Sequence, residues 1–474
     1  MHSPGLRDFT SGSIPRHLIT FAIPMLLGNL MQAAYNTVDS IWVGRVLGPQ
    51  ALASVAVGHP IVFAMIALVT GLGVATTALV SQYYGAREND LVRATIANSI
   101  TLMAVLGVGI SLVGYVLRWP LLRVLRAPED IIYTAATYLG VYAAGFLPTF
   151  LYNVASAVLR GLGDSRTPLR FLAYATIMNI ILDPIFIFGL GPLPRMGVAG
   201  AAWATVISQS FAAVAALIYL VKPSRLIDAS WHLLSLDARL TRATIRIGVP
   251  AGAQQTLVSL GMMAVMSLVN RFGSATTAAF GTGNRIDQFA FMPSVSIGLA
   301  VTALVGQNLG AGRDDRVPLI VRWGLALACS ITGVVALVAL AFPRILVSLF
   351  TTDAEVLSIG SSYLRHLGVA YVGFAAYHVL TGVMRGAGDT MPTFFITLAG
   401  LWLVRIPLAA YLSSSSALGT RGIWIAMTVG YFVALGLGYT YYRTGRWKTR
   451  TMIRRSQIPD GPGPATGESA AASD

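Results

Sequence analysis

The segment TALVSQYYGA (77–86) returns later in the chain as TALVGQNLGA (302–311). A second pair follows in the same order, LRGLGDSRTP (159–168) and MRGAGDTMP (384–392), with one residue deleted from the second copy. Self-similarity over such a long interval predicts a chain that is built from two related halves. Membrane transporters are often assembled from repeats of this kind.

Long apolar runs surround both copies of the repeat. Of the 474 residues 55% are hydrophobic and 11% are charged, whereas soluble domains carry about 25% charged residues. A spanning helix needs roughly 20 mostly apolar residues, while barrel strands are alternating segments of about 10 residues. The continuous runs therefore predict an all-α polytopic membrane protein. We expect twelve transmembrane helices, near residues 17–44, 51–82, 93–117, 131–159, 168–190, 197–221, 244–270, 276–308, 319–342, 356–384, 392–412 and 422–442.

The repeat divides these helices into two pseudo-symmetric six-helix bundles. Equivalent loops fall on the same membrane side, so the repeat is parallel, with its axis along the membrane normal. The expected organisation runs from an N-terminal tail to a basic and then disordered C-terminal tail. Its parts are the tail 1–16, the N-lobe 17–221, the linker 222–242, the C-lobe 243–442 and the tail 443–474.

The basic residues are distributed unevenly between the two predicted membrane sides. Of the 33 Lys and Arg residues, 22 fall on the side of both chain termini, 8 fall on the opposite side and three fall inside predicted helices. By the positive-inside rule this distribution predicts a multi-pass plasma (inner) membrane protein with both termini in the cytoplasm. It also accounts for the net charge of +14 without a nucleic-acid partner. The first residues lack a signal-peptide pattern, and the single Cys329 allows no intrachain disulfide.

Comparing the halves singles out polar residues that the fold does not require. One face of the first helix carries Gln32, Tyr35, Asn36 and Asp39, at the spacing i, i+3, i+4, i+7. The equivalent positions of the seventh helix are Val258, Gly261, Met262 and Val265. Since the fold accommodates both sets, the polar stripe indicates a function, although Asp39 could also lie at the membrane interface near Arg45.

The fifth helix repeats this asymmetry. Asn179 and Asp183 correspond to Trp402 and Ile406, whereas the adjacent Pro184 has a counterpart in Pro407. A carboxylate at the bilayer centre costs about 2.5–3.5 kcal/mol on the insertion scale, so such residues are usually functional. Two acids in one lobe can share a proton or hold a cation. The alternative is that Asp183 merely caps a helix broken at the proline.

Further polar residues are less specific. Asn153, Thr205 and Gln209 could equally serve only to join helices. The candidates for the substrate cleft are Gln32, Tyr35, Asn36, Gln209, Asp287, His378 and Arg285. In the C-lobe, Arg285 and Asp287 could form an ion pair, and His378 could carry a proton or lie in the core. Pro24, whose counterpart is Pro250, could bend the first helix. No nucleotide-binding, catalytic or metal-ligand motif is apparent, so we expect a protein that is not an enzyme and is driven by an ion gradient.

The residues resemble the multidrug and toxic compound extrusion (MATE) transporters. The resemblance rests on IPMLLGNLMQAAYNTVDSIWVGRVLG (23–48) and on the two repeated pairs, and MNIILDPIFIFGLGPLPRMGVAGAAWAT (178–205) is most similar to their DNA-damage-inducible-protein-F-like branch. It implies cation-coupled export by rocking of two lobes, with a helix-1 bend at Pro24. It also implies an N-lobe coupling site formed by Asp39, Asn179, Asp183, Asn153 and Thr205. The acidic C-lobe site of other members is replaced here by Gln254 and Gln255.

Together these observations predict an antiporter that exports organic cations and amphipathic drugs by alternating access. The expected coupling ion is H+, with Na+ at Asp39, Asn179 and Asp183 as the alternative, and with no other cofactor or metal. The expected partners are small amphipathic or cationic substrates and the bilayer, bound by a monomer. A flippase for lipid-linked saccharides would need a strongly basic cleft, for which Arg285, Arg365 and Arg405 are the candidates. A scaffold or receptor without transport activity is the alternative from another class.

Overall fold

A computed structural model describes residues 7–125, 127–191, 194–221, 235–414 and 418–452. Within these residues the chain is helical and has no strand. Eleven helices are long and apolar enough to cross a membrane, or twelve if the bent pair α4 and α5 counts as one span. The prediction of an all-α protein with twelve spans is thus confirmed. Most of the predicted linker and the predicted disordered tail lie outside the described residues.

The N-lobe contains the first seven helices. They are α1 (Ile14–Val46), α2 (Pro49–Gly85), α3 (Asn89–Val124), α4 (Glu129–Ala144), α5 (Phe146–Gly161), α6 (Arg166–Phe188) and α7 (Val198–Val221). The fourth span is bent by 45° between α4 and α5. At the bend, a Cβ on Gly145 would lie 2.6 Å from the Val206 side chain, so only glycine lets this span pack against α7.

The C-lobe contains the remaining elements. They are α8 (Ala238–Asn270), α9 (Ser274–Gly310), η2 (Asp314–Arg316), α10 (Val317–Ala341), α11 (Pro343–Ser348), α12 (Ala354–Gly386), α13 (Met391–Thr397), η3 (Leu398–Arg405), α14 (Ile406–Ser414), α15 (Thr420–Thr444) and η4 (Arg446–Arg450). The segment η3 is π-helical and ends two residues before Pro407. Because proline has no N–H to donate, the eleventh span is wound more loosely just before it.

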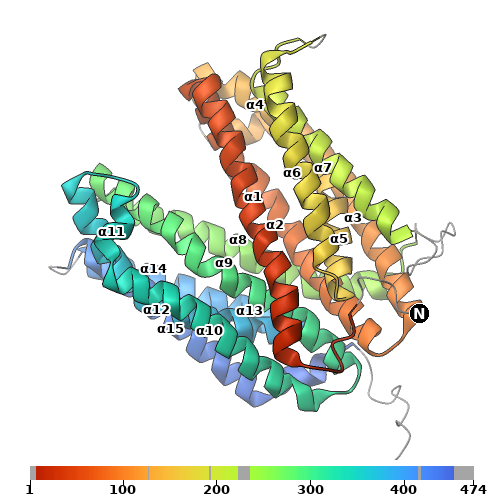
Figure 1. The fold of residues 1–474 in the computed structure, drawn as a ribbon. Helices are drawn as coiled ribbons and strands as arrows, with labels where there is room; N and C mark the ends of the chain where they lie inside the picture. The colour runs from red at the N-terminus through yellow and green to blue at the C-terminus, as the bar shows by residue number, and fades with distance from the viewer. Residues whose placement is uncertain (1–6, 126, 192–193, 222–234, 415–417, 453–474) are drawn as a thin grey trace, which may run out of the picture.

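The two lobes meet at one end of the molecule and diverge toward the other (Figure 1). We call the end that carries residues 7 and 452 the terminal end, and the opposite end the far end. Midway along α2, a Cβ on Gly71 would lie 2.2 Å from the backbone of Gly252 in α8. A Cβ on Gly85 would lie 2.0 Å from the Gln307 carbonyl oxygen. Glycine at these positions therefore allows the helices of the two lobes to touch.

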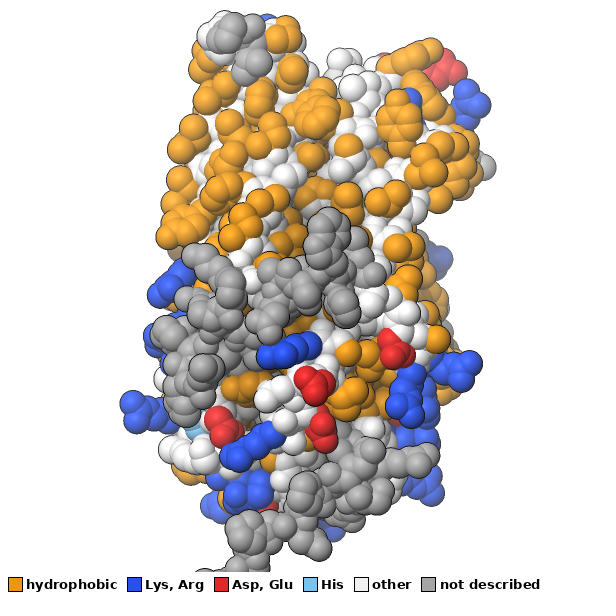
Figure 2. Space-filling model, turned by 90° about the vertical axis from the view of Figure 1, so that its right-hand side faces the viewer, with side chains coloured by type: hydrophobic (Ala, Val, Ile, Leu, Met, Phe, Trp, Pro, Cys, Tyr) orange, Lys and Arg blue, Asp and Glu red, His pale blue; other side chains and the backbone are white. Residues whose placement is uncertain are grey.

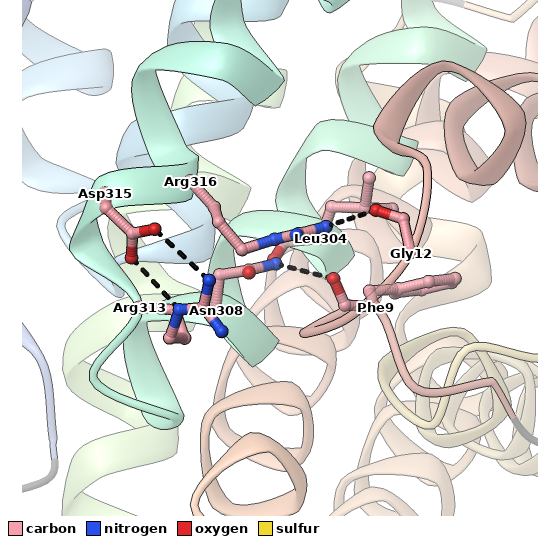
Figure 3. Close-up of polar contacts among 7 residues, drawn as sticks. All are labelled: Phe9, Gly12, Leu304, Asn308, Arg313, Asp315 and Arg316. Carbon is pink, nitrogen blue, oxygen red and sulfur yellow. Dashed lines mark hydrogen bonds and ion pairs between the residues drawn. The ribbon is translucent and has the colours of Figure 1, made fainter. Parts of the chain in front are cut away.

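The N-terminal segment before α1 is packed against the C-lobe. Phe9 is only 1% exposed, and its carbonyl oxygen accepts a hydrogen bond from Asn308 at 3.1 Å. Arg316 donates to the carbonyl oxygen of Gly12 at 2.9 Å. Figure 3 shows both bonds reaching from the α9–η2 region to this segment. The segment therefore belongs to the closed terminal end of the molecule.

The surface reflects a membrane environment. Figure 2 shows a broad hydrophobic surface over the upper part of one face, and most charged side chains of that face lie below it. Exposed residues such as Leu112 (63%), Val116 (60%) and Tyr133 (73%) contribute to the apolar surface of the N-lobe. An apolar band of this kind suits contact with lipid rather than with water.

Candidate functional site

The predicted acidic pair comes together inside the N-lobe. Asn179 and Asp183 of α6 are completely buried, and the Asn179 amide donates to Asp183 Oδ1 at 3.2 Å. Asp39 of α1 lies close enough to Asp183 for their charges to interact. Tyr35 lies one helical turn before Asp39, and its hydroxyl faces Thr205 of α7. Three helices thus place Tyr35, Asp39, Asn179, Asp183 and Thr205 in one cluster, which we call the N-lobe cluster.

The N-lobe cluster contains several buried oxygen atoms that lack a donor. Asp39 Oδ1, Asn179 Oδ1 and Asp183 Oδ2 have no hydrogen-bond partner among the described residues. A buried polar group left without a partner costs about 1–3 kcal/mol, and such groups are rare in native proteins. A proton or a small cation would supply the missing interactions.

Two tyrosines complete the surroundings of the acids. Tyr138 and Tyr142 of α4 lie near Asp39, and their ring centroids are 5.7 Å apart. Neither was predicted from the sequence. The available signal was their spacing, because residues four apart share one face of a helix. Their aromatic rings therefore add apolar surface beside Asp39 in the N-lobe.

Asn153 occupies a different level of the lobe. It lies eight residues before the end of α5, whereas Asp183 lies seventeen residues after the start of α6. At 1.5 Å per residue these positions are roughly 12 and 25 Å from the terminal end. The Asn153 amide donates to the carbonyl oxygen of Thr149 at 2.8 Å. The structure therefore brings together four of the five predicted coupling residues and leaves Asn153 apart.

Asn153 instead lines a cavity of about 250 Å³ near the terminal end, together with Pro24 and Gln32 of α1. Leu299 and Thr302 of α9 line the same cavity, so it lies between the two lobes. Above it the Gln32 amide lies 3.5 Å from Asn36 Oδ1, and Asn36 is exposed. Gln209 of α7 is half-buried. The helix α1 is continuous through the predicted hinge at Pro24.

In the C-lobe, Asp287 has the partners that the N-lobe acids lack. It is 4% exposed and accepts hydrogen bonds from the hydroxyls of Tyr363 and Tyr371, each at 2.5 Å. The predicted Arg285–Asp287 ion pair is wrong. Residues two apart point to different sides of a helix, and Arg285 is exposed while Asp287 faces the core.

The other C-lobe candidates are also engaged with neighbouring side chains. His378 packs against Phe374, with ring centroids 4.3 Å apart. The Arg405 guanidinium lies 4.0 Å from the centroid of the Tyr431 ring. Gln254 accepts from Arg385 at 3.0 Å and donates to Thr397 at 2.9 Å. Unpaired buried carboxylate oxygens are thus a feature of the N-lobe acids and not of Asp287.

The arrangement suits ion binding better than covalent catalysis. Among the described residues there is no group of three or more His, Cys, Asp or Glu that could hold a metal ion. The oxygens of Asp39, Asn179 and Asp183 are hard ligands, which suit a proton or an alkali cation.

Comparison with known proteins agrees with this geometry. The MatE family model matches the chain twice, at residues 24–185 and 250–411. The chain is 35% identical over 452 residues to the probable multidrug resistance protein YpnP of Bacillus subtilis, covering 94% of this chain and 98% of that protein. It is 34% identical to the probable multidrug resistance protein YoeA of the same organism, covering 94% and 96%.

Solved structures of MATE proteins share the fold. The crystal structure of MATE in the bent conformation superposes with a TM-score of 0.88 at 26% identity, covering 95% of this chain and 99% of that one. The crystal structure in the straight conformation gives 0.87 at 27% identity, with the same coverage. With two family matches, an identity of 35% and this likeness, the chain belongs to the MatE family, which is a family of membrane transporters and not of enzymes.

Proposed function

We propose that this protein is a cation-coupled antiporter that exports cationic or amphipathic small molecules across the plasma membrane. The observation that carries the proposal is the set of three buried acceptor oxygens without donors, Asp39 Oδ1, Asn179 Oδ1 and Asp183 Oδ2. Such a set is costly unless an ion occupies it for part of the working cycle. The multidrug resistance proteins among the relatives support the export of small molecules.

H+ is the coupling ion that we favour. A proton bound by Asp183 or Asp39 would convert an unpaired carboxylate oxygen into an O–H donor. A neighbouring unpaired oxygen could then accept a hydrogen bond from it. It would also remove the repulsion between two acids that share one site. Na+ is the alternative, with ligands from Asp39, Asn179 and Asp183. The agreement of all five residue types with the DNA-damage-inducible-protein-F-like branch supports assignment to that branch.

The transport cycle that we propose alternates access between the two membrane sides. The lobes touch at the terminal end and diverge at the far end. With both termini in the cytoplasm, as the basic residues predict, this is an outward-facing arrangement. Ion binding from outside would then neutralise the acids, release substrate from the cleft and favour the return to an inward-facing arrangement. A bend of α1 at Pro24 would couple the two events.

The test uses the purified full-length protein in liposomes with an imposed pH gradient. The uptake of a fluorescent organic cation should require the gradient, and Asp39→Asn and Asp183→Asn should each reduce it at least about ten-fold, which corresponds to 1.4 kcal/mol. Asp287→Asn is the matched control, because it removes a buried acid of the other lobe. Its uptake per folded protein should stay within about two-fold of wild type. Undiminished gradient-driven uptake in both N-lobe variants would refute the coupling site.

A further inference from the structure

A second polar cavity lies at the far end of the C-lobe. Its volume is about 660 Å³, and its lining includes three arginines and one histidine but no carboxylate. The residues that matter here are Arg344, Arg365, Arg421, His366, Ser358 and Ser362. The N-lobe cluster and the cavity between the lobes share none of these residues, so this arginine cavity is a separate site.

Three helices build the arginine cavity. Ser358, Ser362 and Arg365 lie on one face of α12 at intervals of four and three residues. Arg344 comes from α11 and Arg421 from the first turn of α15. Both α11 and α15 pack against α12. The serine-bearing face of α12 therefore forms the base of the cavity and contributes Arg365. Arg344 and Arg421 reach the cavity from the two neighbouring helices.

The positive charges in the cavity are not balanced by protein groups. Within the described part of the chain, the guanidinium groups of Arg344, Arg365 and Arg421 make no hydrogen bond or ion pair. The acids nearest along the chain, Asp353 and Glu355, do not line the cavity. The Asp353 carboxylate accepts bonds from the backbone N–H groups of Glu355 and Val356 at 2.9 and 3.0 Å. Three like charges around one cavity repel each other, so a bound anion would stabilise the arrangement.

The start of α12 also lies at the cavity, since Ala354, the first residue of the helix, lines it. The Asp353 carboxylate already caps the first N–H groups of this helix, so the preference for an anion rests on the arginines. Arg365 lies eleven residues beyond Ala354, at a depth of roughly 16 Å, and it is exposed. An arginine at such a depth in a span normally faces water, protein or a counter-charge.

The surroundings of the cavity are apolar and face outward. Phe342, Ile345 and Leu349 beside Arg344 are 55%, 60% and 72% exposed. Val369, one turn beyond Arg365 on the same face of α12, is 52% exposed. The opposite side of α12 carries Tyr363, which faces Asp287 in the lobe core. Exposed apolar side chains therefore lie next to residues that line the cavity, and an occupant with hydrocarbon chains could lay them on this apolar surface.

We propose that the arginine cavity binds the headgroup phosphate of an anionic phospholipid at the far-end membrane interface. The guanidinium groups of Arg344, Arg365 and Arg421 hold the phosphate oxygens, and the Ser358 and Ser362 hydroxyls add neutral donors. The acyl chains lie along Val369 and the exposed side chains of α10 and α11. This site requires only that the helices span a membrane, and it is independent of the coupling ion and of the exported substrate.

The test is lipid binding to the full-length protein after delipidation in a neutral detergent. Thermal unfolding is followed while dioleoylphosphatidylglycerol, dioleoylphosphatidylcholine or inorganic phosphate is added. Phosphatidylglycerol should raise the melting temperature at a lower concentration than phosphatidylcholine or inorganic phosphate. The variants Arg365→Gln and the double variant Arg344→Gln and Arg421→Gln should each weaken this binding at least about ten-fold, as expected when a charge-assisted bond is lost.

Two control variants test whether the effect is specific to the arginine cavity and to its positive charge. Arg271→Gln removes an exposed arginine at the same end of the same lobe, and it should leave binding within about two-fold of wild type. Arg365→Lys should recover part of the binding, and the lipid-free melting temperature of each variant shows whether it is folded. Equal phosphatidylglycerol binding by wild type and the arginine variants would overturn the proposal. Inorganic phosphate acting at the same concentration as the lipid would overturn the assignment to a phospholipid.

Discussion

Gln82 and Gln307 occupy the same position in the two repeated segments, and each donates a hydrogen bond across the lobe interface. The Gln82 amide donates to the carbonyl oxygen of Gly386 at 2.9 Å, and the Gln307 amide donates to the carbonyl oxygen of Gly161 at 3.0 Å. Gly161 and Gly386 are themselves equivalent in the repeated RG-G-D segments. The interface at the terminal end is therefore pseudo-symmetric down to single hydrogen bonds.

The carbonyl oxygens of the same two glutamines bind the ends of the chain. Gln307 Oε1 accepts from the backbone N–H of Phe9 at 2.9 Å, and Gln82 Oε1 accepts from that of Met452 at 2.9 Å. Both glutamine side chains are fully buried. The segment before α1 and the segment after α15 thus each cover one of the two symmetric contacts, which stabilises the closed terminal end.

The first prediction concerns this pair of glutamines. Replacing both by leucine should remove four buried hydrogen bonds and leave their partners unpaired, which weakens the closed terminal end by about 2–4 kcal/mol. The far ends should then spend more time close together. Spin labels at Leu125 and Leu349, in a background with Cys329→Ser, report that distance by electron–electron double resonance.

The control for this measurement is Gln50→Leu, which changes an exposed glutamine at the start of α2. Wild type and the control should show the same long distance. If the double glutamine variant also keeps that distance, the two side chains do not hold the terminal end closed.

The second prediction concerns the glycines that allow the lobes to touch. A Cβ on Gly85 would lie 2.0 Å from the Gln307 carbonyl oxygen, whereas a Cβ on Gly109 in α3 meets nothing within 4 Å. Gly85→Ala should therefore destabilise the protein by about 1–3 kcal/mol. Gly109→Ala should be neutral or stabilise it by up to about 1 kcal/mol, since alanine is the better helix former. Thermal unfolding in one detergent compares them, and equal melting temperatures would contradict the close approach.

The third prediction contrasts two buried acids. Asp183 Oδ2 lacks a donor, whereas both oxygens of Asp287 accept from tyrosines. Asp183→Asn should consequently raise the stability by about 1–2 kcal/mol, because it replaces an unsatisfied buried carboxylate by a neutral group. Asp287→Asn should lower it by about 1.5–3 kcal/mol, because bonds to a charged acceptor are lost.

Thermal unfolding at one pH and in one detergent measures both effects. Tyr363→Phe provides a further check, since it removes one of the two bonds to Asp287 and should destabilise the protein by a smaller amount than Asp287→Asn. A loss of stability in Asp183→Asn would mean that the N-lobe acid is paired, and a gain of stability in Asp287→Asn would contradict the value of its two tyrosine bonds.

The spans and the repeat could be predicted from the sequence because they depend on patterns along the chain. A run of apolar residues fixes a spanning helix without reference to its neighbours, and the two copies of TALV reveal the duplication directly. Asp39 and Asp183 could be singled out because the second half supplies an internal comparison, in which Val265 and Ile406 stand in their place.

Features that depend on packing could not be predicted in this way. Nothing local in the sequence indicates that Tyr363 and Tyr371 bind Asp287, since the contacts join residues 76 and 84 positions apart. Residues 1–16 were predicted only as a cytoplasmic tail, with no contact to either lobe specified, yet Phe9 is buried in the C-lobe. Asn153 matched a family position by residue type, but its depth along α5 separates it from Asp183.

The last prediction distinguishes the two candidate coupling ions. If a proton is the coupling ion, uptake of an organic cation into liposomes under a pH gradient should be the same in Na+ and in choline buffers. The reason is that one proton on the Asp39–Asp183 pair already supplies the missing donor. A Na+ gradient without a pH gradient should give less than about a tenth of that uptake, a difference of 1.4 kcal/mol or more. Uptake that follows the Na+ gradient, and that Asn179→Ala weakens by removing a carbonyl ligand, would instead identify Na+ as the ion bound by the N-lobe cluster.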